Sequence, residues 1–232
     1  MKDQPSTSAV HDECGHNSSR RILMLASASP ARRTTLQAAH IGHCVMVSTV
    51  DEDAVLSAVH KEAGRDLTAP EQVKVLAREK ACDVAQRILE AGNPQGVAVV
   101  VGCDSMFELD GKVVGKPHSP EVARERLRRM SAHAGKLYTG HCLIDMANPA
   151  AMVEEVSAAT VFIAPLSDED IEAYIASGEP LEVAGSFTVD GRGGPFVDRI
   201  EGDYHGVVGI SLPLVRVLLG RLGYSITDFW VE

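Results

Sequence analysis

The 232-residue sequence is poor in aromatic side chains, in positive charge and in long hydrophobic runs. Aromatic residues make up 4% of the chain, so aliphatic side chains must fill the core, and no row of rings is present for stacking on nucleobases. The formal net charge of −10 argues against binding to a nucleic acid polymer or to an anionic membrane surface. No apolar run approaches the roughly 18 residues that span a bilayer. A phosphorylated ligand must therefore be a small molecule recognised at a local site.

The five cysteines include no C-x-x-C pair, which argues against both a disulfide framework and a zinc site. The first 20 residues are polar and lack an apolar segment, so we interpret residues 1–20 as a disordered tail. No internal repeat or change in composition divides the remainder. We therefore expect residues 21–232 to form a single domain of a cytoplasmic protein.

The most informative segment covers residues 25–33 and reads Leu-Ala-Ser-Ala-Ser-Pro-Ala-Arg-Arg. A buried strand over 21–26 leads into it, and Ser29 is predicted to cap a helix that has a proline at its first position. Ser27, Ser29 and Arg32 then gather at a helix N-terminus, which favours an anion such as phosphate. The alternative for this segment alone is an ordinary strand–helix connection with solvated arginines.

Hydrophobic periodicity and capping signals predict the other elements. Strands are expected over residues 43–49, 97–101, 136–146 and 153–164, and helices over 68–90, 119–130 and 212–222, with another that starts at Ser167. Strands alternate with helices at first and pair antiparallel later, so the fold class is α/β with a mixed, twisted sheet flanked by helices. The basic run 124–129 is interpreted as the solvated face of its helix.

Four charged residues outside the segment 25–33 are candidates for chemistry: Glu52, Lys80, Asp104 and Lys116. Lysines and arginines can neutralise phosphate oxygens, and paired carboxylates can hold a hard divalent ion such as Mg²⁺. Asp104 follows a buried strand, where a carboxylate can deprotonate a water. Each has a structural alternative: Lys80 can solvate its amine above a buried stem, Asp104 can be a turn residue, and Glu52 can be a helix-start acid.

These residues lie within a series of motifs at 25–30 with Arg32, 51–52, 80–81, 101–105, 115–117, 138–140, 184–187, and 200–204 with 207–209. In content and order the series resembles the Maf family of nucleoside triphosphate pyrophosphatases, over almost all of residues 22–229. The resemblance implies an inosine-triphosphatase-like α/β fold, a nucleotide-binding cleft and a homodimer. It also implies hydrolysis of a nucleoside triphosphate to the monophosphate and diphosphate with help from Mg²⁺ or Mn²⁺.

The same resemblance gives the residues their expected roles. Asp104 corresponds to the proton acceptor; Arg32, Lys80 and Lys116 correspond to the cations that we assign to the triphosphate, beside Ser27 and Ser29. Glu52 corresponds to the acid after the second strand, and we assign Glu52 with Asp104 to the metal as a hypothesis. The implied cellular role is removal of non-standard nucleotides, and the family is also linked to restraint of cell division.

Three positions that the resemblance connects with substrate specificity are Ala31, Ser105 and Asp190. Relatives that act on dTTP and UTP tend to carry Arg, Thr and Gln there, and relatives that act on 7-methyl-GTP carry a Trp at the first position and an acid at the third. This chain matches neither set, so the preferred base stays open. Two alternatives also stay open: a nucleotide-binding regulator of septation that is catalytically weak, and a phosphatase that releases orthophosphate.

Overall fold

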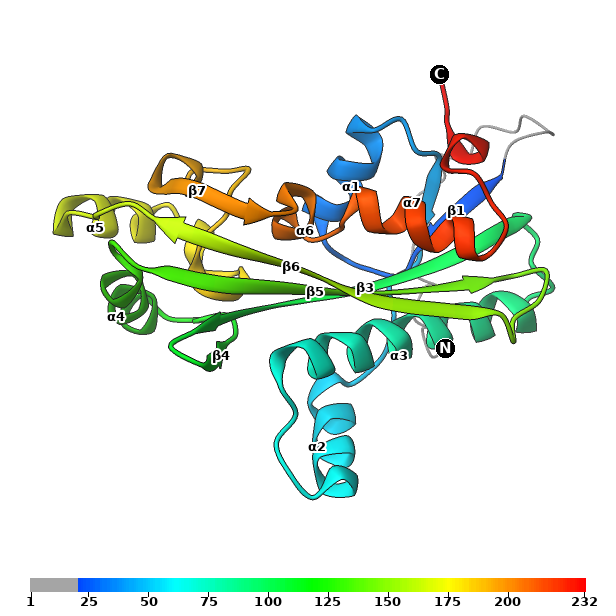
Figure 1. The fold of residues 1–232 in the computed structure, drawn as a ribbon, viewed down its shortest axis with the longest axis horizontal. Coiled ribbons are helices and arrows are strands. Elements are labelled where there is room, and N and C mark those ends of the chain that lie inside the picture. The colour runs from blue at the N-terminus through cyan, green and yellow to red at the C-terminus, as the bar shows by residue number, and fades with distance from the viewer. Residues whose placement is uncertain (1–20) are drawn as a thin grey trace, which may run out of the picture.

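One twisted, seven-stranded mixed sheet forms the centre of the computed structural model, which describes residues 21–232 (Figure 1). The strands are β1 (Ile22–Leu25), β2 (His43–Val45), β3 (Val97–Leu109), β4 (Lys112–Val114), β5 (Ala134–Asp145), β6 (Met152–Ile163) and β7 (Val197–Gly202). Their order is β2-β1-β3-β5-β6-β7, and β4 pairs with β3. Strand β1 is parallel to β2 and β3, whereas the other pairs are antiparallel. The predicted mixed α/β fold is thereby confirmed; the predicted tail, residues 1–20, lies outside the described residues.

The α-helices are α1 (Pro30–Ala38), α2 (Glu52–Ala63), α3 (Ala69–Glu90), α4 (Pro120–Met130), α5 (Asp168–Ala176), α6 (Tyr204–Val208) and α7 (Leu212–Arg221). Short 3-10 helices are η1 (Glu179–Leu181), η2 (Ala184–Ser186), η3 (Gly194–Phe196) and η4 (Ile226–Phe229). The predicted caps are present, because the hydroxyls of Ser29, Ser119 and Ser167 each accept a backbone N–H of the first helical turn. Within residues 21–232, no helix is long and apolar enough to cross a membrane.

Helices cover both faces of the sheet (Figure 1). Helix α3 packs on one face through an apolar stripe that includes Ala77, Ala81 and Val84. Helices α1 and α7 cover the other face at the end of the sheet that holds β1, and α4 and α5 pack against a separate cluster around Phe107 at the far end. The long strands β3, β5 and β6 connect the two ends.

Two expectations about strand and helix limits were wrong. Strand β3 does not end at residue 101 but continues to Leu109, so Asp104 lies within the strand and not after it. Strand β2 ends at Val45, and the acidic residues that follow it begin α2, so Glu52 is a helix-start residue. Helix α2 has no fully buried side chain and therefore no apolar stripe for periodicity to detect.

The edge of β3 next to β1 has a gap in its strand pairing. Strand β1 pairs with residues 97–101 of β3, and β4 pairs with residues 107–109 of the same strand. Between them, residues 102–106 have no neighbouring strand on that edge within the part of the chain that the structure describes. Strand β5 pairs with β3 along the opposite edge from residue 99 to residue 108. The gap is thus an opening in an otherwise continuous sheet, and Asp104 lies at its middle.

Helix α3 lies unusually close to the sheet because two glycines face it. A Cβ added at Gly102 of β3 would lie 2.1 Å from the carbonyl oxygen of Ala77 and 2.8 Å from the backbone nitrogen of Ala81. A Cβ at Gly140 of β5 would lie 2.2 Å from the carbonyl oxygen of Val73. Any larger residue at these two positions would push the helix backbone away from the strands.

We expect Gly102→Ala to lower the free energy of unfolding by about 1–3 kcal/mol or more, because the helix backbone cannot move aside without loss of packing. Urea denaturation measures this change. Gly220→Ala in α7 is the matched control: apart from its chain neighbours and the backbone of its own helix, no described atom lies within 4 Å of the added methyl, and alanine favours the helix by about 1 kcal/mol. Unchanged stability of Gly102→Ala would contradict the close approach of α3.

Candidate functional site

Three of the predicted site residues meet beside the gap in the sheet. The Nζ of Lys80 in α3 lies 2.6 Å from Oδ1 of Asp104 in β3 and 2.7 Å from Oε1 of Glu52 at the start of α2. The side chains of Lys80 and Asp104 are 11% and 10% exposed, whereas that of Glu52 is 51% exposed. The structural alternatives for Lys80 and Asp104 are therefore wrong: the amine is not simply solvated, and the carboxylate is not in a turn.

Burial raises the pKa of Asp104 above the ordinary aspartate value, although the positive charges of Lys80 and Arg32 oppose this effect. A carboxylate with a raised pKa holds a proton more readily, which suits a general base. The neighbouring thiol of Cys103 has its pKa raised to about 11 by burial, so it stays protonated and is a poor nucleophile.

The guanidinium of Arg32 is held inside the protein by four hydrogen bonds. Its Nε donates to the carbonyl oxygen of Gly209 at 2.7 Å, and its Nη1 donates to Ser27 Oγ and to the carbonyl oxygen of Cys103, both at 2.9 Å. Its Nη2 donates to Ser105 Oγ at 3.0 Å. A guanidinium has five N–H groups, so one remains for a ligand.

Arg32 also continues the hydrogen bonding of β1 into the gap. The backbone N–H of Ala26 donates to the carbonyl oxygen of Val101, and the carbonyl of Cys103 is the next one along the same edge of β3. Because Arg32 donates to that carbonyl, its side chain takes the place of the next residue of a strand. The arginine is thus part of the sheet's structure as well as a cation beside the gap.

Ser27 and Ser29 form the turn that the sequence predicts. Ser29 Oγ accepts the backbone N–H of Arg32 as the helix cap, and Ser27 Oγ accepts the backbone N–H of Ser29 at 3.2 Å. Within residues 21–232, no acceptor takes the hydroxyl hydrogen of either serine. Both hydroxyls can therefore donate to an anion placed at the start of α1.

A directed chain of hydrogen bonds leads away from Arg32, and the sequence analysis did not predict it. Thr139 Oγ1 donates to the carbonyl oxygen of Gly206 at 2.8 Å, so Ser105 must donate to Thr139 and accept from Arg32. The motif at residues 138–140 is the one signal in the sequence that points to Thr139. Since Gly206 lies in α6 and Gly209 directly follows this helix, Arg32 and its partners fix α6 at two points.

A second buried group, His141, supports the same region. Its Nε2 accepts the backbone N–H of Ser211 at 2.8 Å, so the proton lies on Nδ1, which donates to the carbonyl oxygen of Thr139 at 3.0 Å. Burial lowers the pKa of His141 to about 4. The imidazole is therefore neutral near pH 7 and serves as a fixed connection between β5 and the N-cap of α7.

The structure does not bring Lys116 into contact with the other candidates. This residue is exposed in the loop between β4 and α4, and its ammonium makes no hydrogen bond or ion pair within residues 21–232. The loop follows β4, which borders the gap in the sheet. Lys116 is thus at the rim of the opening and free to approach a ligand.

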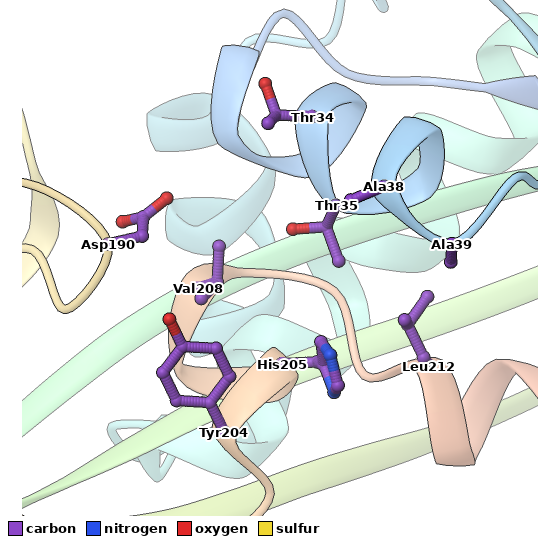
Figure 2. Close-up of a pocket in the computed structure, with 9 residues that line it drawn as sticks. All are labelled: Thr34, Thr35, Ala38, Ala39, Asp190, Tyr204, His205, Val208 and Leu212. Atoms are coloured by element: carbon purple, nitrogen blue, oxygen red, sulfur yellow. The ribbon is translucent and has the colours of Figure 1, made fainter.

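A pocket of about 320 Å³ lies between α1 and the segment of α6 and α7 (Figure 2). Asp190 faces it from the loop between η2 and η3, opposite Thr34 and Thr35 of α1. Tyr204 and His205 of α6 close another side. Of the three predicted specificity positions, Asp190 lines this pocket. Ala31 is in the first turn of α1, and Ser105 contacts Arg32, so the structure does not gather all three around one cavity.

The pair Glu52 and Asp104 suits a hard divalent cation. Within the part of the chain described by the structure, no group of three or more His, Cys, Asp or Glu residues could hold a metal by itself. Glu52 and Asp104 nevertheless converge, because an oxygen of each lies within 2.7 Å of the same nitrogen of Lys80. Two carboxylates fit Mg²⁺ or Mn²⁺ when phosphate oxygens and waters supply the other ligands.

Comparison with known proteins shows which family the chain resembles in sequence. The family model described as "Maf-like protein" matches residues 22–222. A nucleoside triphosphate pyrophosphatase of Nocardia farcinica is 52% identical over 90% of this chain and 96% of its own, and one of Rhodococcus erythropolis is 49% identical over the same shares. A protein of the same name from Mycobacterium marinum is 44% identical over 90% of this chain and 97% of its own.

Among solved structures, the Staphylococcus aureus Ham1 protein matches with a TM-score of 0.34 and 14% identity, over 62% of this chain and 72% of that chain. This likeness is too distant to bear on activity. The family model and the similar pyrophosphatases each cover most of the described residues. The chain therefore belongs to the Maf-like protein family.

Proposed function

We propose that this protein is a nucleoside triphosphate pyrophosphatase that converts nucleoside triphosphates to monophosphate and diphosphate. The observation that carries the proposal is the buried Asp104, with its raised pKa, held beside Lys80 and Glu52 at a gap in the sheet. The names of the similar bacterial proteins support it. The catalytic machinery belongs to one domain that covers residues 21–232.

In this reaction Asp104 accepts a proton from the water that attacks the α-phosphorus. The bond from that phosphorus to the bridging oxygen breaks, and diphosphate leaves. Lys80 neutralises charge that builds on the phosphate oxygens. Glu52 and Asp104 would hold a divalent metal, Mg²⁺ or Mn²⁺, which would supply further charge neutralisation at the phosphates.

The start of α1 receives the triphosphate in this proposal. The hydroxyls of Ser27 and Ser29 and the remaining N–H of Arg32 all lie at this helix end, where an anion is favoured. Arg32 acts mainly by holding the turn and the strand edge in place, because four of its five N–H groups are already used. Lys116 reaches the phosphates from the rim of the gap.

The pocket beside α1 is the proposed site of the base. Asp190 supplies an acceptor for a base that carries N–H donors, and Tyr204 supplies a ring face. Ala31 has no large side chain with which to restrict a ligand near the first turn of the helix. Together with Ser105, Asp190 and Ala31 set a substrate range that includes non-standard nucleotides. The proposed cellular role is removal of such nucleotides in the cytoplasm. The proposed active form is a homodimer.

We expect wild-type protein with Mg²⁺ or Mn²⁺ to release diphosphate and monophosphate from at least one member of a panel of canonical and modified triphosphates. Asp104→Asn should lower kcat by roughly two or more decades, because the amide cannot accept the proton. Product identification by anion-exchange chromatography checks both statements. Orthophosphate as the product supports a phosphatase, and no turnover of any nucleotide supports a regulator of cell division; either result contradicts the proposal.

We expect the acid limb of kcat/KM to lie at a higher pH than an ordinary aspartate gives, because Asp104 loses its basic form as the pH falls through its raised pKa. Lys80→Met removes a charge that opposes this rise, so the limb should move to still higher pH and kcat should fall about 100-fold. A pH–rate profile measures both effects. Lys74→Met, which removes another lysine of α3 and breaks its surface pair with Glu154 of β6, should leave the acid limb in place. If the acid limb of kcat/KM lies at the same pH in Lys80→Met and Lys74→Met, the assignment of Asp104 as the general base is contradicted.

We expect Asp190→Asn to change the ratio of kcat/KM between two triphosphates that differ in their base by about tenfold, because a charged acceptor is replaced. Steady-state kinetics on the nucleotide panel gives this ratio. Asp198→Asn, at an exposed position of β7, is the matched control and should not alter it. If wild type and Asp190→Asn give the same ratio of kcat/KM between the two triphosphates, the nucleobase does not bind in the pocket beside α1.

A further inference from the structure

Helix α4 carries four arginines, and one of them differs from the others in its contacts. Arg124 pairs with Glu172, Arg128 pairs with Asp168 at 2.9 Å, and Arg129 pairs with Asp110 at 2.8 Å. Arg126 pairs with no carboxylate in the described range 21–232. The predicted solvated face is thus correct for three of these arginines and wrong for Arg126.

Arg126 is directed instead at two neutral acceptors. Its Nη1 donates to the carbonyl oxygen of Gly115 and to Ser186 Oγ, the latter at 3.1 Å. Burial lowers the pKa of Arg126, yet a guanidinium stays charged in a protein. Partial burial of a cation without a counter-ion costs desolvation free energy, and the two hydrogen bonds of Arg126 offset part of this cost. The loop of Gly115 follows β4, which borders the gap in the sheet, and the turn of Ser186 packs on Phe107 of β3.

The first acceptor belongs to the loop of Lys116. Gly115 directly precedes this lysine, and the carbonyl of Gly115 is part of the peptide bond to Lys116. On the other side of the lysine, Pro117 is buried and the backbone N–H of His118 donates to the carbonyl oxygen of Leu181 at 3.3 Å. Arg126 therefore fixes the loop on one side of Lys116, while η1 fixes it on the other.

The second acceptor belongs to a rigid turn. Ser186 is fully buried and has a φ of +61°, and Gly185 before it has a φ of +74°. A Cβ at Gly185 would lie 2.8 Å from the ring of Phe107, so the turn lies directly on β3. Because Asp104 is in the same strand, the turn and the proposed base belong to one rigid unit.

We propose that Arg126 is a positioning residue for Lys116: it clamps the loop of this lysine to a turn that is fixed on the strand of Asp104. The inference rests on the proposed function, since it assigns to Lys116 a task at the triphosphate. Arg126 itself need not touch the substrate. Its effect on the reaction passes through the place that it gives to Lys116.

A double-mutant cycle in the full-length protein tests this coupling. We expect Arg126→Met and Lys116→Met each to lower kcat/KM for the best triphosphate by about tenfold or more. In the double variant, the loss should equal that of Lys116→Met alone, because a mispositioned lysine and an absent one are equivalent. Arg128→Met, which breaks only the exposed ion pair between this helix and Asp168 of α5, should keep the wild-type value.

Three results would overturn the inference: no loss in Arg126→Met, an equal loss from Arg126→Met in both backgrounds, or wild-type kinetics in Lys116→Met. In each case diphosphate release by the wild type still supports the proposed function, so the two can fail separately. Thermal denaturation shows whether Arg126→Met is folded. If it is not, Arg126→Gln takes its place in the cycle, since both hydrogen bonds come from Nη1 and the shorter, uncharged glutamine side chain does not extend to that position.

Discussion

The close approach of α3 to the sheet is the constraint on which the site depends. Gly102 and Gly140 present no side chain to the helix, so the backbone of α3 lies against β3 and β5. Lys80 follows Ala77 by less than one turn, and its ammonium therefore reaches the carboxylate of Asp104 at 2.6 Å. Moving the helix outward by the width of a methyl group would lengthen this contact. The ion pair is thus a result of backbone packing and does not depend on the two charges alone.

The gap in strand pairing along β3 gives the site its opening. Strand β3 changes its neighbour from β1 to β4 along this edge, so the backbone N–H and C=O groups between the two pairings need other hydrogen-bond partners. Arg32 satisfies part of this edge with a side chain and is joined to α6 through Gly209 and the Ser105–Thr139 chain. Arg32 is therefore both a candidate ligand of the triphosphate and a part of the hydrogen bonding that holds the fold, so its substitution is expected to affect activity and stability together.

Local signals in the sequence were enough for α1, α3 and α4, because a serine cap or a capping box marks each start. They could not give the contact of Lys80 with Asp104, which are 24 residues apart and meet only when α3 is docked. The partner of Arg32 at Gly209 is 177 residues away and gives no local signal. The resemblance to a family assigned Glu52, Lys80 and Asp104 to one site, and the structure brings these three together through tertiary packing, whereas their roles in the reaction stay predictions.

Helix α2 carries Glu52 at its start and has no fully buried side chain. Shifting this helix would expose little apolar surface, so the free-energy cost of its displacement is small compared with that of α3. The site therefore has two unequal halves: Lys80 and Asp104 are anchored in the core, whereas Glu52 is attached to an element that can withdraw. A shift of α2 would therefore lengthen the contact between Glu52 and Lys80 while Lys80 and Asp104 stay paired in an unchanged core.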